Sequence, residues 1–122
     1  MSSTADMPSG QADLRVTLAD VARRLSAESP FETVFERGEE ISVELYAPVE
    51  TDRQNPHERD ELYIVASGTG VFSRDEERVP FGPGDLLYVP AHAPHRFESF
   101  TGDFRTWVIF YGPKRPAPSP KS

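Results

Sequence analysis

The sequence NPHERDE (residues 55–61), continued by LYIVASG (residues 62–68), decides the fold of this chain. A run of β-branched and aromatic residues that ends in a Ser-Gly turn is typical of a β-strand. A second stretch, GDLLYVPAHAPH (residues 84–95), also joins a glycine turn to an apolar run, and it ends on a histidine. Both stretches therefore predict strands with polar, potentially metal-binding residues beside their ends.

Segments with strand character recur on both sides of these stretches, and turns rich in glycine or proline separate them. Residues 76–78 are charged and are interpreted as a hairpin tip. Many short strands with this spacing predict an all-β domain, either a sandwich or a closed barrel. The predicted strands are residues 31–35, 41–46, 62–66, 70–73, 86–89, 95–100 and 105–111.

One short N-terminal helix is predicted over residues 17–25. Thr17 is a suitable N-cap, because its hydroxyl can accept a hydrogen bond from a free backbone N–H of the first turn. Leu18, Val21 and Leu25 recur at helical spacing and form one apolar stripe. The proline at position 30 is expected to prevent the helix from continuing.

The two ends of the chain differ in composition from the part between them. Residues 1–12 are small and polar, which predicts a disordered arm. Residues 113–122 alternate proline with other residues, which predicts an extended, disordered tail. The part between these two ends, residues 13–112, is predicted to be one folded domain, which suits a chain of 122 residues.

The composition excludes several classes of partner. The net charge of -7 disfavours binding to nucleic acids and to anionic membrane surfaces. No apolar stretch is long enough to span a bilayer, and the start lacks the features of a secretory signal. The chain has no cysteine, which excludes disulfides and thiolate ligands. We expect a cytoplasmic protein whose partner is a small molecule.

His57 and Glu61 could hold one metal ion only if the chain between them bends. Four steps of a straight strand span about 13 Å, whereas metal bonds to imidazole and carboxylate are about 2 Å long. The intervening Glu58-Arg59-Asp60 is charged and free of β-branched residues, which suits a bend. Asp60 is expected to point away from Glu61, toward solvent.

Alternation along the strands predicts which residues face the interior. Tyr63 shares a face with Glu61, whereas Leu62 and Ile64 take the opposite, also apolar, face. In the later strand, the charged pair Arg96 and Glu98 marks the solvent side, so His95 and Phe97 are predicted to point inward.

These two stretches resemble the two sequence motifs of the cupin family. The first motif is Gly, five residues, His-x-His, three or four residues, Glu, six residues, Gly, and this chain matches it at His57, Glu61 and Gly68. The second is Gly, five residues, Pro-x-Gly, two residues, His, three residues, Asn. The chain matches the second motif at Gly84, Pro90 and His95. The resemblance spans residues 41–111.

The chain also departs from the two motifs at four positions. Val49 stands in place of the first glycine, and Asn55 stands in place of the first histidine. His92 replaces the glycine of the second motif, and Ser99 replaces its closing asparagine. A histidine tolerates the left-handed backbone of a glycine position, so His92 is interpreted as a turn residue rather than a ligand.

The resemblance implies a small single-domain cupin of the conserved-barrel type, a double-stranded β-helix or jelly-roll barrel. It implies one divalent ion, Fe, Mn, Ni or Zn, held by His57, Glu61 and His95. Asn55 either binds the ion through its amide oxygen or hydrogen-bonds a water on it. Cupins commonly pair, and the apolar outer face at Leu62 and Ile64 needs cover, so we expect a homodimer.

Two functions follow from the resemblance. The first is a metal-dependent enzyme, dioxygenase-like or isomerase-like, that acts on a small oxygenated molecule in the barrel cavity. The alternative is a non-catalytic module that binds a small molecule, with a structural metal or none. Tyr63, Phe97 and Trp107 either line the substrate pocket or fill the core, and Tyr63 is the candidate for proton transfer.

Overall fold

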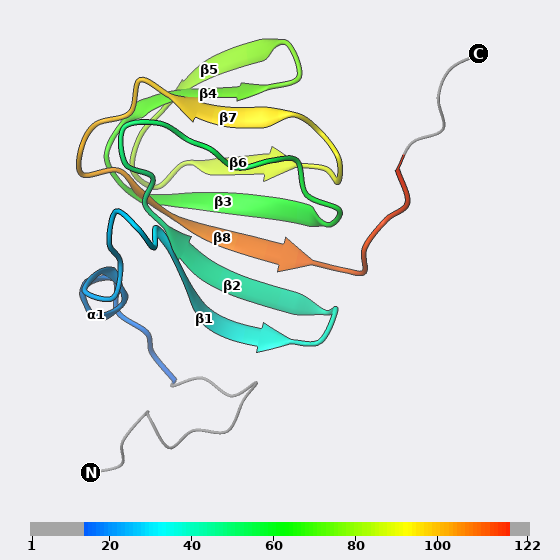
Figure 1. The fold of residues 1–122 in the computed structure, drawn as a ribbon, viewed down its shortest axis with the longest axis horizontal. Coiled ribbons are helices and arrows are strands. Elements are labelled where there is room, and N and C mark those ends of the chain that lie inside the picture. Colours follow the sequence, from blue (N-terminus) through cyan, green and yellow to red (C-terminus); the bar gives the residue numbers. More distant parts are fainter. Residues whose placement is uncertain (1–13, 118–122) are drawn as a thin grey trace.

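The computed structural model describes residues 14–117, and the predicted arm at residues 1–12 lies outside this range. Eight strands and one short helix make up the fold, which confirms the predicted all-β class (Figure 1). The elements are α1 (Leu18–Ala22), β1 (Phe31–Arg37), β2 (Ile41–Tyr46), β3 (Asp60–Ser67), β4 (Gly70–Arg74), β5 (Glu77–Phe81), β6 (Leu86–Val89), β7 (His95–Glu98) and β8 (Arg105–Tyr111).

Several boundaries differ from those expected from the sequence, and β5 is not among the predicted strands. The helix begins with Thr17 as N-cap, whose side chain accepts from the backbone N–H of Asp20, but it ends at Ala22 rather than at residue 25. The N–H of Leu25 bonds back only three residues, to Ala22, so the last turn is too tight to continue the helix. The predicted hairpin tip at residues 76–78 is partly strand, because β5 already begins at Glu77.

The strands form two antiparallel sheets, with orders β1-β2-β8-β3-β6 and β5-β4-β7. β3 pairs with β8, and β4 pairs with β7. The consecutive strands β3 and β4 therefore lie along β8 and β7 as one two-stranded ribbon that passes from the first sheet into the second. This is the arrangement expected for a double-stranded β-helix.

The core lies between the two sheets and is rich in aromatic rings. Tyr63 and Phe97 are 0% and 1% exposed, and their ring centroids are 4.8 Å apart in an edge-to-face contact. Both side chains point inward as predicted, and both fill the core. Trp107 pairs with Leu45 and Ile64 on the opposite face of the first sheet, so the structure does not place it with the other two pocket candidates.

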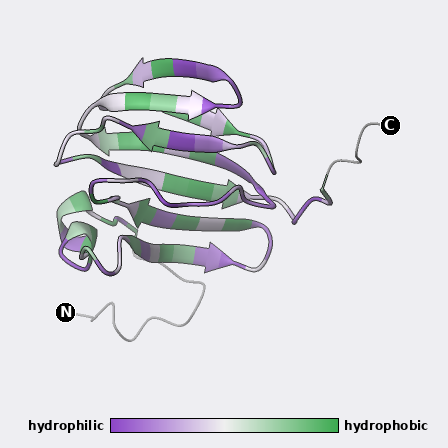
Figure 2. Ribbon diagram, turned by 45° about the horizontal axis from the view of Figure 1, so that its top comes forward, coloured by the Kyte–Doolittle hydropathy of each residue, from purple (hydrophilic) through white to green (hydrophobic). Residues whose placement is uncertain are grey.

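The outer face of the five-stranded sheet is apolar from β2 to β6. On β2 the inner face carries Glu44 and Tyr46, the latter paired with the buried Thr106, so the apolar residues of this strand face outward. Figure 2 shows how hydrophobic residues recur along the strands of both sheets. The outward apolar residues are Ile41, Val43, Leu45, Leu62, Ile64, Ala66, Leu86, Tyr88, Trp107, Ile109 and Tyr111.

Within residues 14–117, no helix is long and apolar enough to cross a bilayer. The cytoplasmic location expected from the sequence stays a prediction.

Gly68 forms the corner where the ribbon passes between sheets. Its φ is +85°, and a Cβ atom there would lie 2.4 Å from the Cα of Phe104. Gly68→Ala is therefore expected to lower the free energy of unfolding by about 2 kcal/mol or more, because of the strained backbone and the clash. Gly102→Ala is the control, since nothing lies within 4 Å of its Cβ position. Urea unfolding measures both, and equal stability of the two variants would contradict this account.

We propose that a second copy of the chain covers the apolar outer face. Leu86, Tyr88 and Ile64 are 62%, 45% and 39% exposed there and neighbour one another across β3 and β6, and such a gathering of exposed apolar side chains favours an interface. Ile64→Lys is expected to convert a dimer into a monomer in light scattering. Val49→Lys places the same charge on an exposed side chain of a loop, at 54% exposure, and should leave the dimer intact. A monomeric wild-type chain would refute the proposal.

Candidate metal centre

The three side chains predicted as ligands meet at one end of the two sheets. His57 lies in the segment before β3, Glu61 is the second residue of β3, and His95 is the first residue of β7. The starts of β3 and β7 and the end of β8 lie at this end (Figure 1). Each of the three residues offers one ligand atom, and these atoms all lie within 4.8 Å of one another.

Glu61 is a buried carboxylate without a hydrogen bond. Its exposure is 0%, and neither oxygen has a hydrogen-bond partner among the described residues. The Nε2 of His95 lies 3.1 Å from Glu61 Oε1, yet it too lacks a hydrogen bond of acceptable geometry. A buried charge without hydrogen bonds is costly, and a cation between these atoms would remove that cost. The donor set therefore fits a divalent metal ion.

Hydrogen bonding prepares His95 for that role. Its Nδ1–H donates to the carbonyl of Ala93 at 2.9 Å, which leaves the lone pair of Nε2 facing Glu61. Burial alone would lower the pKa of His95, but the contact with Glu61 raises it above the ordinary value. Burial lowers the pKa of His57, and Glu61 offsets this only in part, so His57 is neutral at pH 7, as a ligand must be.

The chain bends between His57 and Glu61, as predicted. Residues 58 and 59 form a bend, and only Asp60 begins the strand. The carbonyl of His57 accepts from the backbone N–H of His92 at 2.7 Å, which fixes its position relative to the turn before β7. The bend thus brings His57 and Glu61 to one side of the same small volume.

Asp60 points away from Glu61, but it does not face solvent as expected. It is 8% exposed, and its carboxylate accepts from the backbone N–H of Ala91 at 2.8 Å and from Arg115 Nε at 3.0 Å. Arg115 lies in the predicted tail, whose residues 118–122 are outside the described range. The backbone carbonyl of Arg115 also accepts a hydrogen bond from His92 Nε2 at 2.7 Å. Asp60 therefore ties the bend to the turn and to the tail.

His92 and Asn55 both lie outside the cluster. His92 has a φ of +70°, in accordance with its interpretation as a turn residue, and its ring is occupied by Arg115. The side chain of Asn55 is exposed, so the fold does not bring it to the three ligands. Of the residues expected beside the three ligands, Tyr63 does lie there, with its ring centroid 6.0 Å from that of His95.

Gln54 takes the place expected for Asn55, and sequence analysis missed it. It is 9% exposed, and its Oε1 lies 3.2 Å from His57 Nε2 and 3.3 Å from the hydroxyl of Tyr63. Motif spacing pointed to Asn55, because only the path of the loop decides which of two neighbouring amides faces inward. The one signal available was that Gln54 is the longer of two adjacent amides.

Asp52 anchors the segment that carries Gln54 and His57. This carboxylate is 1% exposed and accepts from the hydroxyl of Tyr46 at 2.5 Å and from the backbone N–H of Phe97 at 2.9 Å. It also accepts from the backbone and side-chain N–H groups of Gln54, both at 3.1 Å. Four donors thus satisfy a buried charge and hold residues 47–59 against β7.

Glu44 is a second carboxylate close enough to Glu61 to feel its charge. It lies on the inner face of β2, opposite Val108. Burial, followed by the charges of Glu61 and Glu36, raises the pKa of Glu44 from 4.5 to about 7. Burial raises the pKa of Tyr63 well above its usual range, so this phenol stays protonated. Glu44 is therefore better suited to proton transfer near pH 7 than Tyr63.

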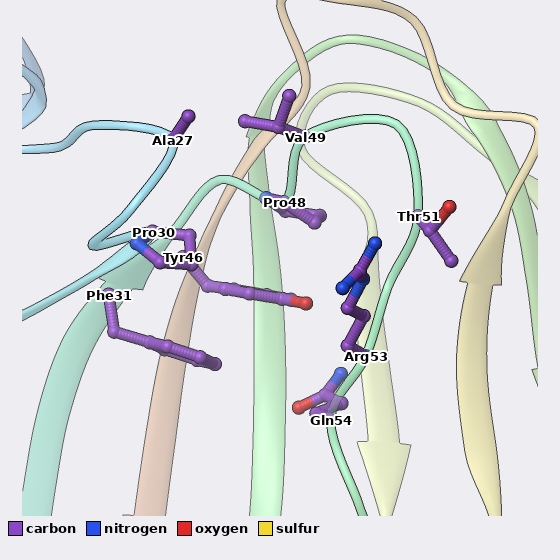
Figure 3. A pocket seen from close by; sticks show the side chains of 9 residues that line it. All are labelled: Ala27, Pro30, Phe31, Tyr46, Pro48, Val49, Thr51, Arg53 and Gln54. Atoms are coloured by element: carbon purple, nitrogen blue, oxygen red, sulfur yellow. The ribbon is translucent and has the colours of Figure 1, made fainter.

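A pocket of about 350 Å³ lies on the other side of Gln54 (Figure 3). The rings of Phe31 and Tyr46 stack at 4.1 Å between centroids and 10° between planes, and they form one wall. Figure 3 shows the side chains of Arg53 and Gln54 beside the edge of the Tyr46 ring. A smaller pocket of about 250 Å³ opens at His57 and Phe110. The smaller recess thus opens at one of the three ligand residues, and the larger one opens at Gln54, which contacts His57.

Comparisons with known proteins agree with this geometry. The family described as "Cupin domain" matches residues 42–110, more than half of the 122 residues. An uncharacterized protein of Streptomyces coelicolor, SCO3923, is 38% identical over 82 residues, which cover 66% of this chain and 78% of that protein.

Solved structures show the same fold at low identity. A cupin-2 domain protein of Shewanella frigidimarina superimposes with a TM-score of 0.61 and 16% identity, over 77% of this chain and 91% of that chain. A cupin of Methanocaldococcus jannaschii with a double-stranded β-helix fold gives 0.58 and 15%, over 67% and 78%. One conclusion follows from the family match, from the pairing of β3 with β8 and of β4 with β7, and from the convergence of His57, Glu61 and His95. The chain belongs to the cupin family.

Proposed function

We propose that this cupin is a metal-dependent enzyme that acts on a small oxygenated molecule. One divalent ion, Fe, Mn, Ni or Zn, would be held by His57, Glu61 and His95. The observation that carries the proposal is the state of Glu61, a fully buried carboxylate with no hydrogen bond, next to a histidine whose lone pair faces it. A residue kept only for stability would be hydrogen-bonded or replaced by an apolar side chain.

The chemistry follows from the ligand set and from the groups beside it. An ion with two imidazoles and one carboxylate retains open positions, where it activates oxygen or polarises a carbonyl, depending on its identity. Glu44 has the pKa of an acid–base group near neutrality and is not itself a ligand. We assign it the role of accepting a proton from, or donating one to, the bound molecule.

The pocket beside Gln54 provides the place where the small molecule binds. Its stacked wall of Phe31 and Tyr46 suits a flat ligand, and Arg53 can contribute a positive charge to a carboxylate or enolate oxygen. Gln54 lines this pocket and also contacts His57, so this one side chain connects the pocket to the ligand set. The core around Tyr63 and Phe97 is packed, so the ligand is expected in a recess at the surface rather than at the centre of the barrel.

A non-catalytic binding module is the alternative, and turnover separates the two. We expect the purified protein, loaded with Fe²⁺, Mn²⁺, Ni²⁺ or Zn²⁺, to consume oxygen or isomerise substrate within a panel of small enols, catechols and hydroxy-carbonyl compounds. His57→Ala should abolish this turnover, and Asn55→Ala should not. Binding of a panel member without turnover for any of the four ions would favour the module.

Glu61→Gln tests the metal site without an assay of activity. Elemental analysis should find one divalent ion per wild-type chain, and a large loss in the variant. In the presence of a chelator, the free energy of unfolding of Glu61→Gln is expected to equal that of the wild type or to exceed it by up to about 2 kcal/mol. The reason is that a buried charge without hydrogen bonds is removed. Metal should stabilise the wild type by about 2.7 kcal/mol at a hundredfold excess over Kd.

Glu58→Gln is the matched control for that experiment, because Glu58 is a carboxylate of the same loop whose side chain is exposed. This variant should bind metal like the wild type. A loss of several kcal/mol for Glu61→Gln in chelator would show that Glu61 is structural.

Glu44→Gln should change how stability depends on pH in the metal-free protein. The folded-state pKa of Glu44 is raised above its ordinary value of 4.5 to about 7, so its contribution is present below pH 4.5 and is lost as the pH rises through 7. Between pH 5 and 8, the free energy of unfolding of the variant should therefore rise relative to that of the wild type, by on the order of 1 kcal/mol after solvent screening. Urea unfolding across this range measures it, with exposed Glu40→Gln as control. A constant difference would contradict the assignment.

A further inference from the structure

We propose that Gln54 supplies a fourth protein ligand, its Oε1, to the ion held by His57, Glu61 and His95, and that Asp52 positions this amide. The inference rests on the proposed metal site and names the part of the site that the sequence motifs do not contain. Gln54 touches His57 directly, whereas the exposed Asn55 does not reach the cluster.

The spacing of the atoms is that of neighbouring ligands. Two atoms bound to one ion at about 2.1 Å, with an angle between 90° and 109°, are about 3.0 to 3.4 Å apart. Gln54 Oε1 and His57 Nε2 are 3.2 Å apart, and Glu61 Oε1 and His95 Nε2 are 3.1 Å apart. The separation of 4.0 Å between His57 Nε2 and Glu61 Oε1 corresponds to a wider angle across the site.

The contact between Gln54 and His57 needs either a proton or a metal ion between the two atoms. Oε1 has only lone pairs to offer, and an imidazole nitrogen that binds metal has given up its proton. Two such acceptors at 3.2 Å repel each other unless a proton or a metal ion lies between them. The same pair of atoms therefore forms a hydrogen bond without the ion and a pair of ligands with it.

Asp52 determines which end of the amide faces the site. Its Oδ2 accepts from Gln54 Nε2 at 3.1 Å, and its Oδ1 accepts from the backbone N–H of Gln54 at 3.1 Å. Turning the amide over would place Oε1 against a carboxylate that is 1% exposed, so only one orientation satisfies both groups. The oxygen of Gln54 is thereby directed toward His57 before any ion arrives.

The resulting set has two imidazole nitrogens, one carboxylate oxygen and one neutral amide oxygen. Such a mixed nitrogen and oxygen set carries a single negative charge and suits Fe²⁺, Mn²⁺ or Zn²⁺ better than Cu⁺, which prefers thiolates and thioethers. A six-coordinate ion would retain two open positions, enough for a substrate that binds through two oxygens. Gln54 also lines the pocket beside the stacked Phe31 and Tyr46.

Selective labelling tests the ligation directly, because the chain contains only three side-chain amides, those of Gln11, Gln54 and Asn55. One equivalent of Zn²⁺ is added to the full chain labelled with ¹³C and ¹⁵N in these amides. The Gln54 carbonyl carbon should move downfield, because coordination withdraws electrons from the C=O group, and the Asn55 signals should stay in place. The Gln54→Ala variant assigns the signals.

Metal affinity provides the second measurement. Competition with a chelator should show Zn²⁺ and Mn²⁺ binding to Gln54→Ala weakened by about tenfold to a hundredfold. The neighbouring Asn55→Ala should bind like the wild type. If Gln54→Ala does not fold, the labelled wild-type signals alone decide the question.

The outcomes separate this inference from the proposed function. If the wild type binds one ion while the Gln54 signals do not move, or if Gln54→Ala binds as tightly as the wild type, then Gln54 is no ligand and the three-residue site stands. If the wild type binds no divalent ion, the proposed metal site itself is wrong, and the inference falls with it.

Discussion

The buried carboxylate of Asp52 is the constraint on which the site depends. Residues 47–59 belong to no strand, so no sheet ladder fixes their path. Asp52 replaces the ladder by accepting from the backbone of Phe97, the hydroxyl of Tyr46 and both N–H groups of Gln54. A buried carboxylate is costly unless it accepts hydrogen bonds, so the folded state favours the arrangement in which Asp52 makes all of these bonds. They place Gln54 and His57 above the start of β3.

A second layer of bonds completes the position of His57 from the opposite side. The turn before β7 contributes the N–H groups of Ala91 and His92, and Arg115 reaches back from beyond β8 to Asp60. Three parts of the chain that are distant in sequence therefore converge on the bend between His57 and Glu61. This support allows a loop residue to hold a fixed place among strand residues.

The carboxylates of the candidate site lower the stability of the fold when no cation is bound. Glu61 is a fully buried carboxylate and Glu44 a half-buried one, and Glu61 contributes to the raised pKa of Glu44. Such groups disfavour the folded state in the absence of a cation. The compensating energy comes from the aromatic core of Tyr63, Phe72, Phe97 and their neighbours, which is buried and continuous between the sheets. Burial of this core thus offsets the cost of placing the carboxylates beside it.

The sequence by itself determined seven of the eight strands of the described residues, the inward orientation of Glu61, Tyr63 and Phe97, and three candidate ligands, because side chains alternate along a strand and glycine marks many of the turns. Only the tertiary structure decided that Gln54 rather than Asn55 faces His57, that Asp60 is buried, that Glu44 faces inward, and that Trp107 faces outward. A loop has no period, and an amphipathic strand does not reveal which face is covered. Both are settled by contacts between residues far apart in the chain, such as that of Asp52 with Phe97.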